Sequence, residues 1–173
     1  MILRRWRTED RESLRRINAD PVVMEFYPST LSNEESDKII EGQRRHFDRY
    51  GFGLFAVELK KTESMIGWVG VQNVPIEAHF TPAVEIGWRI ASEHWNQGYA
   101  TEAAGRVLKF SFDDINLSEV VAMTYVGNHR SRRVMEKLNM AYNPRDDFDN
   151  SHPKLRDTWL MPHVLYRISS KKV

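Results

Sequence analysis

Hydrophobic and polar positions alternate strictly between Val84 and Ile90, which is the pattern of a half-buried strand. The apolar face of this strand is formed by Val84, Ile86, Trp88 and Ile90. The other face carries Glu85, Gly87 and Arg89. The period then changes, because a polar loop at 92–97 is followed by small and apolar residues at helical spacing. The predicted helix opens at Gly98, and its inward face is formed by Ala100, Ala103, Ala104, Val107, Leu108 and Ser111.

A strand, a short loop and a helix that begins at a glycine form a potential anion site. The first N–H groups of a helix have no partner within the helix, and its dipole favours negative charge there. Gly98 lets a phosphate approach the backbone, and the small side chain of Ala100 leaves room for it. The competing interpretation is an ordinary strand-to-helix connection, in which glycine and alanine only ease packing.

The same patterns predict the other elements of the chain. Strands are expected at 2–7, 52–59, 65–74, 119–126 and 159–169, with Pro162 indicating an edge or a bulge in the last. Helices are expected from a Thr8 cap to Pro21, from a Ser32–Glu35 capping box to Gly51, and over 129–138 behind an Asn128 cap. Polar loops occupy 75–82 and 143–154. The order predicts an antiparallel meander and one parallel crossover, from 84–91 to 119–126. That arrangement is a single α+β domain with a mixed sheet.

Composition narrows the classes of function. The 173 residues are 41% hydrophobic and 28% charged, as in soluble globular domains, and suffice for one domain with a real core. With 25 basic and 24 acidic residues, no overall field recruits nucleic acid or membrane. The absence of cysteine excludes disulfides, thiolate metal ligands and a cysteine nucleophile. The N-terminus becomes charged too early for a signal peptide, and no apolar run reaches membrane-span length, so we expect a cytoplasmic protein.

Three polar side chains are candidates for chemistry near the crossover, where ligands tend to bind at the carboxyl ends of diverging strands. Glu85 would accept a proton, directly or through water, if its face of the strand lines a cleft. Its alternative is an exposed glutamate paired with Arg89. Asn128 and Ser131 follow strand 119–126, and their alternative roles are a helix cap and a first-turn serine. The histidines show no pair at metal-ligand spacing; they are residues 46, 79, 94, 129, 152 and 163.

Two segments together resemble a known family. VEIGWRI, continuing through WNQGYATEA, and NHRSRRVMEKLNM are similar to the GNAT superfamily of acetyl-CoA-dependent N-acetyltransferases, and more narrowly to its RimJ/RimL-type branch. The likeness runs through nearly the whole chain and implies a three-layer α/β/α domain, residues 1–173, with a mixed, mostly antiparallel sheet. Two positions depart from the pattern. Trp95 stands where the family signature has Gln or Arg, and Asn139 stands where it usually has Gly, in a left-handed turn that Asn tolerates.

The resemblance implies a set of site residues. Backbone N–H groups from Gln97 to Thr101 would hold the CoA pyrophosphate, and the backbones of Trp88 and Ile90 would pair with pantetheine like an added strand. Arg132 or Arg133 would lie near the 3′-phosphate. The expected CoA-binding residues are Trp88, Ile90, Trp95, Asn96, Gln97, Gly98, Tyr99, Ala100, Thr101 and Asn128. The expected catalytic residues are Glu85, as base, and Ser131, as proton donor to the leaving thiolate.

The expected function is transfer of an acetyl group from acetyl-CoA to a primary amine, by direct attack in a ternary complex and without a metal. The amine is a protein N-terminus or a small molecule, and acidic residues such as Glu25, Asp146, Asp147 and Asp149 are possible attractants for it. Two alternatives remain: a regulatory module that binds acyl-CoA without catalysis, and a domain with no CoA affinity. We expect a monomer or a homodimer, with the C-terminal strand as a candidate dimer surface.

Overall fold

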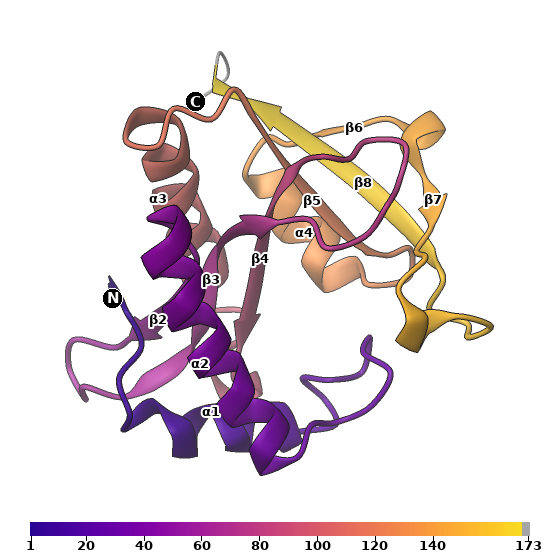
Figure 1. Cartoon of the computed structure of the whole chain (residues 1–173). Coiled ribbons are helices and arrows are strands. Elements are labelled where there is room, and N and C mark those ends of the chain that lie inside the picture. Colours follow the sequence, from indigo (N-terminus) through magenta and orange to yellow (C-terminus); the bar gives the residue numbers. More distant parts are fainter. Residues whose placement is uncertain (171–173) are drawn as a thin grey trace.

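The structure is a computed structural model that describes residues 1–170. The strands are β1 (Ile2–Arg4), β2 (Leu54–Glu58), β3 (Met65–Asn73), β4 (Val84–Ile90), β5 (Glu119–Tyr125), β6 (Ala141–Tyr142), β7 (Phe148–Asp149) and β8 (Pro162–Ser169). The helices are α1 (Asp10–Ala19), α2 (Asn33–Tyr50), α3 (Tyr99–Asp113) and α4 (His129–Lys137), with short helical turns at Ser92–His94, Pro144–Asp146 and Pro153–Leu155. This order confirms the predicted α+β fold (Figure 1).

One mixed sheet holds the molecule together, in the order β1-β2-β3-β4-β5-β8-β6, with β7 also paired to β8. Its neighbours are antiparallel except β4 and β5, which are the predicted parallel pair. Those two strands share a single paired position, Glu85 with Val121, whereas β3 and β4 pair from Gly67–Ile90 to Asn73–Val84. Beyond Glu85 the two strands therefore diverge, as Figure 1 shows toward its lower part.

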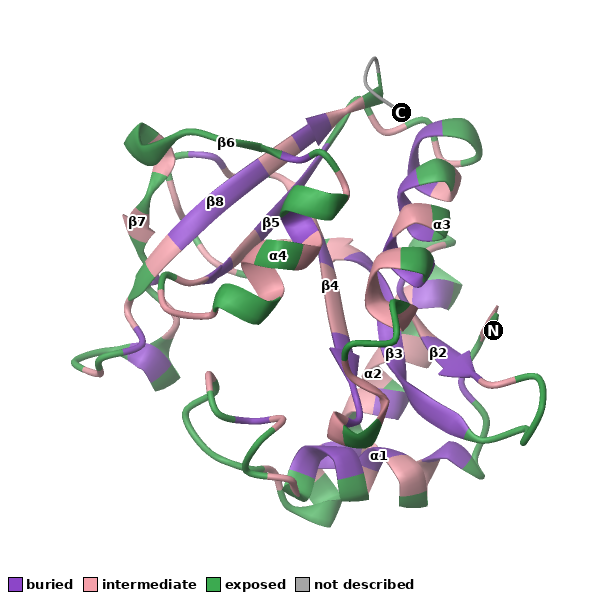
Figure 2. Cartoon of the chain, turned by 180° about the vertical axis from the view of Figure 1, so that it is seen from behind, coloured by how far each residue is buried: buried purple, intermediate pink, exposed green. Residues whose placement is uncertain are grey.

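Helices cover both faces of the central part of the sheet, where β2, β3 and β5 bury residues on both of their sides. On one face α3 packs over a core that includes Val69, Ile86 and Val120. On the other, α1 and α2 pack over Ala56 and Trp68 of β2 and β3. The loop before β4 covers β5 and β8 on that same face, with a small cluster formed by Phe80, Val121 and Leu165. Figure 2 shows α3 and α4 in front of the sheet, with the buried strands behind them.

Several helix ends follow the sequence prediction. Ser32 and Glu35 form the complete capping box of α2, and Gly51 ends that helix in the left-handed region at φ 77°. Asn128 caps α4 through a bond from the Ser131 amide to its side-chain oxygen, at 3.1 Å. Asn139, just after α4, has φ 56°, so this asparagine adopts the left-handed conformation of the turn, as predicted.

Two predictions at the ends of the chain were wrong. Thr8 does not cap α1, because the helix starts after Glu9 without a side-chain cap; Asp10 instead accepts the Arg7 amide at 2.7 Å. β8 is not an edge strand, because β5 lies on one side of it and β6 and β7 on the other. Pro162 is its first residue, where a missing N–H is tolerated. On the side away from β5, β7 pairs with residues 162–163 and β6 with residues 166–167, so these parts of the C-terminal strand offer no free edge to a second copy.

Candidate active site

A cavity of about 960 Å³ occupies the gap between the diverging strands. It is lined by β4, by the N-terminal turns of α3 and α4, by the end of β5, and by the loops after α1 and before β8. Its volume lies at the upper end of the range for small-molecule sites. The gap follows from the topology, because a strand that loses its neighbour leaves a space in the sheet that side chains alone do not fill.

The N-terminus of α3 opens on this cavity without a side-chain cap. Gly98 has φ 85°, a backbone conformation that residues with a side chain rarely adopt. No atom lies within 4 Å of the position that a Cβ atom would take at this residue. Trp95 fixes the preceding loop, because its indole N–H donates to the Ile90 carbonyl at 2.7 Å. The first N–H groups of α3 thus face open space at the positive end of the helix dipole, an arrangement that suits phosphate oxygens.

At alternate residues of β4, the backbone N–H and C=O groups point into the gap between β4 and β5. The Ala91 N–H donates to the Ile66 carbonyl at 2.8 Å, so odd-numbered residues here bond toward β3. The backbone groups of Trp88 and Ile90 consequently point toward β5, which has already diverged. Apart from the Ile90 carbonyl, which accepts the Trp95 indole N–H, this edge is open to an extended ligand with its own amide groups, as pantetheine has.

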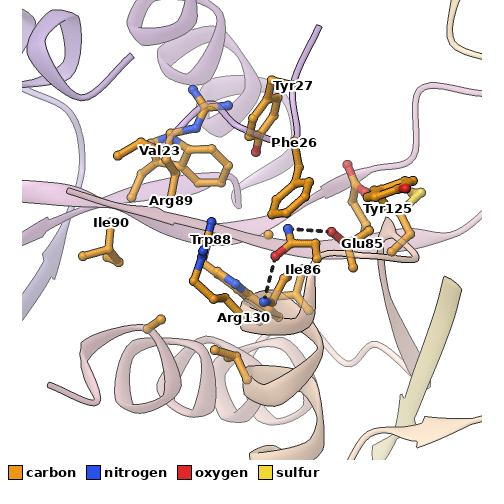
Figure 3. Close-up of a pocket in the computed structure, with 18 of the residues that line it drawn as sticks. Val23, Phe26, Tyr27, Glu85, Ile86, Trp88, Arg89, Ile90, Tyr125 and Arg130 are labelled. Atoms are coloured by element: carbon orange, nitrogen blue, oxygen red, sulfur yellow. Dashed lines mark hydrogen bonds between the residues drawn. The ribbon is translucent and has the colours of Figure 1, made fainter. Parts of the chain in front are cut away.

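Glu85 stands where β4 and β5 separate, and its carboxyl group lines the cavity (Figure 3). Gln72 Nε2 donates to Glu85 Oε1 at 2.9 Å. Gln43 Nε2 donates to Gln72 Oε1 at 3.3 Å, and Gln43 Oε1 accepts the Leu54 amide at 2.8 Å. Because the Leu54 amide is a donor only, it fixes the direction of this chain of hydrogen bonds, and Gln72 must present its N–H to Glu85.

The environment of Glu85 raises its pKa above the ordinary value of 4.5, because burial penalises the charged form. The bond from Gln72 acts in the opposite direction and lowers the pKa, by stabilising the carboxylate. The alternative of an exposed glutamate paired with Arg89 is wrong. Glu85 is partly buried, and the Arg89 guanidinium instead donates to Asn18 Oδ1 at 2.5 Å.

Asn128 and Ser131 reach the cavity from the start of α4. The Asn128 side chain is held at both ends, because Oδ1 accepts the Ser131 amide and Nδ2 donates to Thr124 Oγ1 at 3.0 Å. The Ser131 hydroxyl makes no hydrogen bond with another residue among 1–170. It is therefore a free hydroxyl at the wall of the cavity opposite β4.

Contacts between the loop after α1 and residues of α4 and β5 cross the mouth of the cavity. Arg130 forms an ion pair with Glu25, and its guanidinium lies 4.7 Å from the Trp95 ring centroid. Phe26 stacks on Tyr125, with ring centroids 5.7 Å apart. These contacts join α4 and β5 to the segment 20–32 across the mouth of the cavity.

The structure brings together nearly all of the predicted site residues. Those that line the cavity are Glu85, Trp88, Ile90, Trp95, Asn96, Gly98, Tyr99, Ala100, Thr101, Asn128 and Ser131. Gln97 does not line it, because its side chain turns back and donates to the Glu93 carbonyl at 3.2 Å. The acidic residues 25, 146, 147 and 149 do not line it either. Asp146 is instead paired with Arg167.

Sequence reasoning did not assign several polar residues to the site, among them Gln72, Arg89 and His163. Gln72 lies opposite Glu85 in the β3–β4 register, and Arg89 lies on the same face of β4. His163 also lines the cavity, and burial lowers its pKa, so the ring is neutral near pH 7. Its Nδ1 lies 3.0 Å from the Met161 carbonyl and must carry the proton, which leaves Nε2 as the acceptor.

Within residues 1–170 no group of three or more His, Cys, Asp or Glu side chains is placed to hold a metal ion. Among the same residues, no helix combines the length and the apolar character that a membrane crossing requires.

An open strand edge beside an uncapped helix N-terminus, with the Glu85 carboxyl group lining the same cavity, suits an acyl-CoA. Comparison with known proteins gives the family. The acetyltransferase (GNAT) domain model matches residues 1–141, so the chain belongs to the GNAT acetyltransferase family. Its relatives include YkkB of Bacillus subtilis, 32% identical over 71% of this chain and 70% of that one. The N-acetyltransferase YnaD of the same organism is 27% identical over 81% and 78%.

Solved structures share the fold. A GNAT-family acetyltransferase from Bacillus anthracis superposes with a TM-score of 0.80, at 24% identity, over 98% of this chain and 95% of that one. Spermidine N-acetyltransferase from Vibrio cholerae, in complex with CoA and spermine, has a TM-score of 0.75 at 20% identity, over 99% and 96%. The protein is thus an N-acetyltransferase with acetyl-CoA as the acyl donor.

Proposed function

We propose that the protein transfers an acetyl group from acetyl-CoA to a primary amine by direct attack in a ternary complex, with Glu85 as the base. The observation that carries the proposal is the position of the Glu85 carboxyl group, inside the cavity at the point where β4 and β5 separate. A carboxylate with a raised pKa is a better base near neutral pH than an ordinary glutamate.

Acetyl-CoA would lie along the open edge of β4. Its pyrophosphate would contact the amides at the start of α3, and its pantetheine amides would pair with Trp88 and Ile90. Trp95 and Asn128 would hold the two sides of this channel, because each is fixed by hydrogen bonds to the backbone. The β4 amides that point into the gap would stabilise negative charge on the thioester oxygen.

The acceptor amine would approach on the face that carries Glu85, under the loop after α1. An ammonium ion has no free electron pair, so Glu85 would first take its proton, directly or through one water. The new bond joins the amine nitrogen to the acetyl carbon, and the bond from that carbon to sulfur breaks. The Ser131 hydroxyl would donate a hydrogen bond or a proton to the departing thiolate.

A place in the RimJ/RimL-type branch would make a protein N-terminus one acceptor class, and a small amine is the other. The function that the geometry supports best is an amine N-acetyltransferase, because the Glu85 carboxyl group lines the cavity that also contains the open edge of β4.

The proposal is tested by measuring thiol release from acetyl-CoA with a panel of amines, together with CoA binding by calorimetry. Turnover with an amine, lost in Glu85→Gln while acetyl-CoA still binds, is the expected result. CoA binding without turnover by any amine would favour a regulatory module, and absence of CoA binding would refute the site.

A further inference from the structure

Arg89 is a buried arginine without a carboxylate partner. Only 8% of its surface is exposed, and it lines the cavity on the same face of β4 as Glu85. Its one side-chain hydrogen bond within residues 1–170 is from Nη1 to Asn18 Oδ1, and no salt bridge in that part of the chain reaches it. Figure 3 shows Arg89 beside Tyr27, at the opposite side of the pocket from Glu85.

Neutral groups hold the guanidinium in place. Asn18 is fully buried, and its Nδ2 donates to Ser36 Oγ at 3.0 Å, which directs Oδ1 at Arg89. The rings of Tyr27 and Trp68 have centroids 4.2 Å and 5.3 Å from the guanidinium carbon. Such contacts orient a cation, but they do not neutralise it, and buried charges are normally paired.

Two donors of this site have no acceptor. Arg89 Nε and Trp68 Nε1 are both buried without a hydrogen-bond partner, and both residues line the cavity. They are directly opposite each other in the β3–β4 register, and the Trp68 ring lies over Gly87 between Arg89 and Glu85. Arg11 Nε is also unpartnered, but that side chain has an ion pair with Glu41. Since buried donors are nearly always satisfied, the Arg89–Trp68 pair calls for an acceptor from outside the chain.

The charge of the cavity favours an anion at this place. Glu85 is the only carboxylate among its described lining residues. The basic residues that line it are Arg89, Arg130, Arg133, Lys137 and Lys154. The CoA phosphates are not the anion that Arg89 faces, because Arg89 points to the side covered by α1 and α2, whereas α3 covers the other side.

We propose that Arg89 and Trp68 form a carboxylate subsite, so that the acceptor is a primary amine that also carries a carboxylate, of the amino acid class. The inference rests on the proposed function and specifies its acceptor. The guanidinium fork matches the two oxygens of a carboxylate, and the Trp68 N–H is a second donor without a partner in a residue that lines the same cavity. The Cα atoms of Glu85 and Arg89, four residues apart on a strand, are separated by about 13 Å. Amine and carboxylate would therefore be recognised at opposite sides of the cavity.

The test compares amino acids that have increasing numbers of methylenes between amine and carboxylate, each against its own carboxamide. We expect the carboxylate member of at least one pair to have the higher kcat/KM, by about tenfold to a hundredfold, as for one charge-assisted hydrogen bond. Arg89→Gln should abolish that preference without changing acetyl-CoA affinity. Arg16→Gln, an exposed arginine outside the cavity, is the matched control and should retain it.

Two further variants keep the test valid if Arg89→Gln does not fold. Arg89→Lys keeps the charge but not the fork, and Trp68→Phe removes the indole N–H together with the pyrrole ring but keeps an aromatic side chain; each should reduce the preference in part. Equal turnover of carboxylate and carboxamide at every length would overturn the subsite while leaving N-acetyltransfer intact. If no amine is acetylated, calorimetry of the same pairs with the CoA complex decides: binding that needs both carboxylate and Arg89 supports the subsite, and its absence overturns it.

Discussion

At the scale of single residues, Glu85 combines a function with a cost in stability. Its pKa is raised in the folded state, so folding favours the protonated form. Between the unfolded pKa, near 4.5, and the higher folded pKa, the native state binds more protons than the unfolded state. Stability therefore falls as pH rises through that window and stays lower above it. The ionised form of Glu85, which catalysis requires, is therefore the form that burial in the folded protein disfavours.

We predict that Glu85→Gln reduces kcat by about a hundredfold or more near neutral pH, as for loss of a general base. The same variant should unfold at a higher temperature than the wild type above the folded pKa, and at a similar temperature below pH 4.5. Thermal unfolding across pH, beside initial rates, checks both. Unchanged turnover would remove Glu85 from the mechanism.

The amide of Gln72 tunes that base. Its bond stabilises the Glu85 carboxylate and lowers the pKa. Gln72→Leu should therefore move the acidic limb of the kcat profile to higher pH, because the carboxylate forms less readily. Gln97→Leu is the matched substitution outside the cavity and should leave the profile unchanged. A profile that does not move in Gln72→Leu would show that Glu85 does not set the limb.

His163 is a second candidate proton acceptor, because it lines the cavity and its Nε2 carries no proton. If Glu85 is the base, His163→Gln should leave the position of the acidic limb where it is in the wild type. A limb that disappears in His163→Gln and persists in Glu85→Gln would assign the base to the imidazole. Both variants are measured with the same amine and with acetyl-CoA at saturation.

At the scale of elements, the helix ends are where local sequence decides structure. The capping box of α2 and the Asn128 cap of α4 were predictable, because their partners lie within three residues. The start of α1 was not, because Arg4 holds Asp10 by two bonds of 2.7 and 2.8 Å and also binds Glu58, which is distant in sequence. β6 and β7 were missed for the same reason: two-residue strands have no period, and pairing with β8 defines them.

Variants at the N-caps of α2 and α4 can distinguish an effect on stability from an effect on ligand binding. Ser32→Ala and Asn128→Ala should each lower stability by about 1 kcal/mol, the usual loss at an N-cap. Only Asn128→Ala should also weaken CoA binding, because Asn128 lines the cavity and Ser32 does not. Denaturation midpoints and calorimetry distinguish the effects. Equal CoA affinity in both variants would limit Asn128 to a structural role.

At the scale of the whole molecule, the sequence predicted the cavity through one feature, the parallel crossover. It could not predict Gln72, His163 or Arg89 as lining residues, because their places depend on the register between strands and on loops folded over them. The motif residues were predictable, since they occupy one strand and the starts of two helices. The acceptor side is built from distant segments and needed the fold.

The gap between β4 and β5 also makes a prediction about stability. CoA would span the gap and contact both halves of the sheet, whereas ADP would reach only the start of α3. At about 100 times its own Kd, either ligand adds about 2.7 kcal/mol whatever its affinity, so the two ligands must be compared at equal concentration. At equal concentration CoA should raise the unfolding temperature more than ADP does. Identical shifts would mean that the strand gap contributes nothing to binding.

A single cavity that is shared by both parts of the site has one more consequence. The open edge of β4 and the face of Glu85 are two sides of the same space, so a molecule along the first forms a wall for a molecule on the second. Occupancy of one part therefore changes the free energy of filling the other, and this coupling is reciprocal by thermodynamic necessity. The factor by which CoA changes acceptor affinity must equal the factor by which the acceptor changes CoA affinity. When each ligand is titrated with and without the other, the four binding free energies must therefore form a closed thermodynamic cycle.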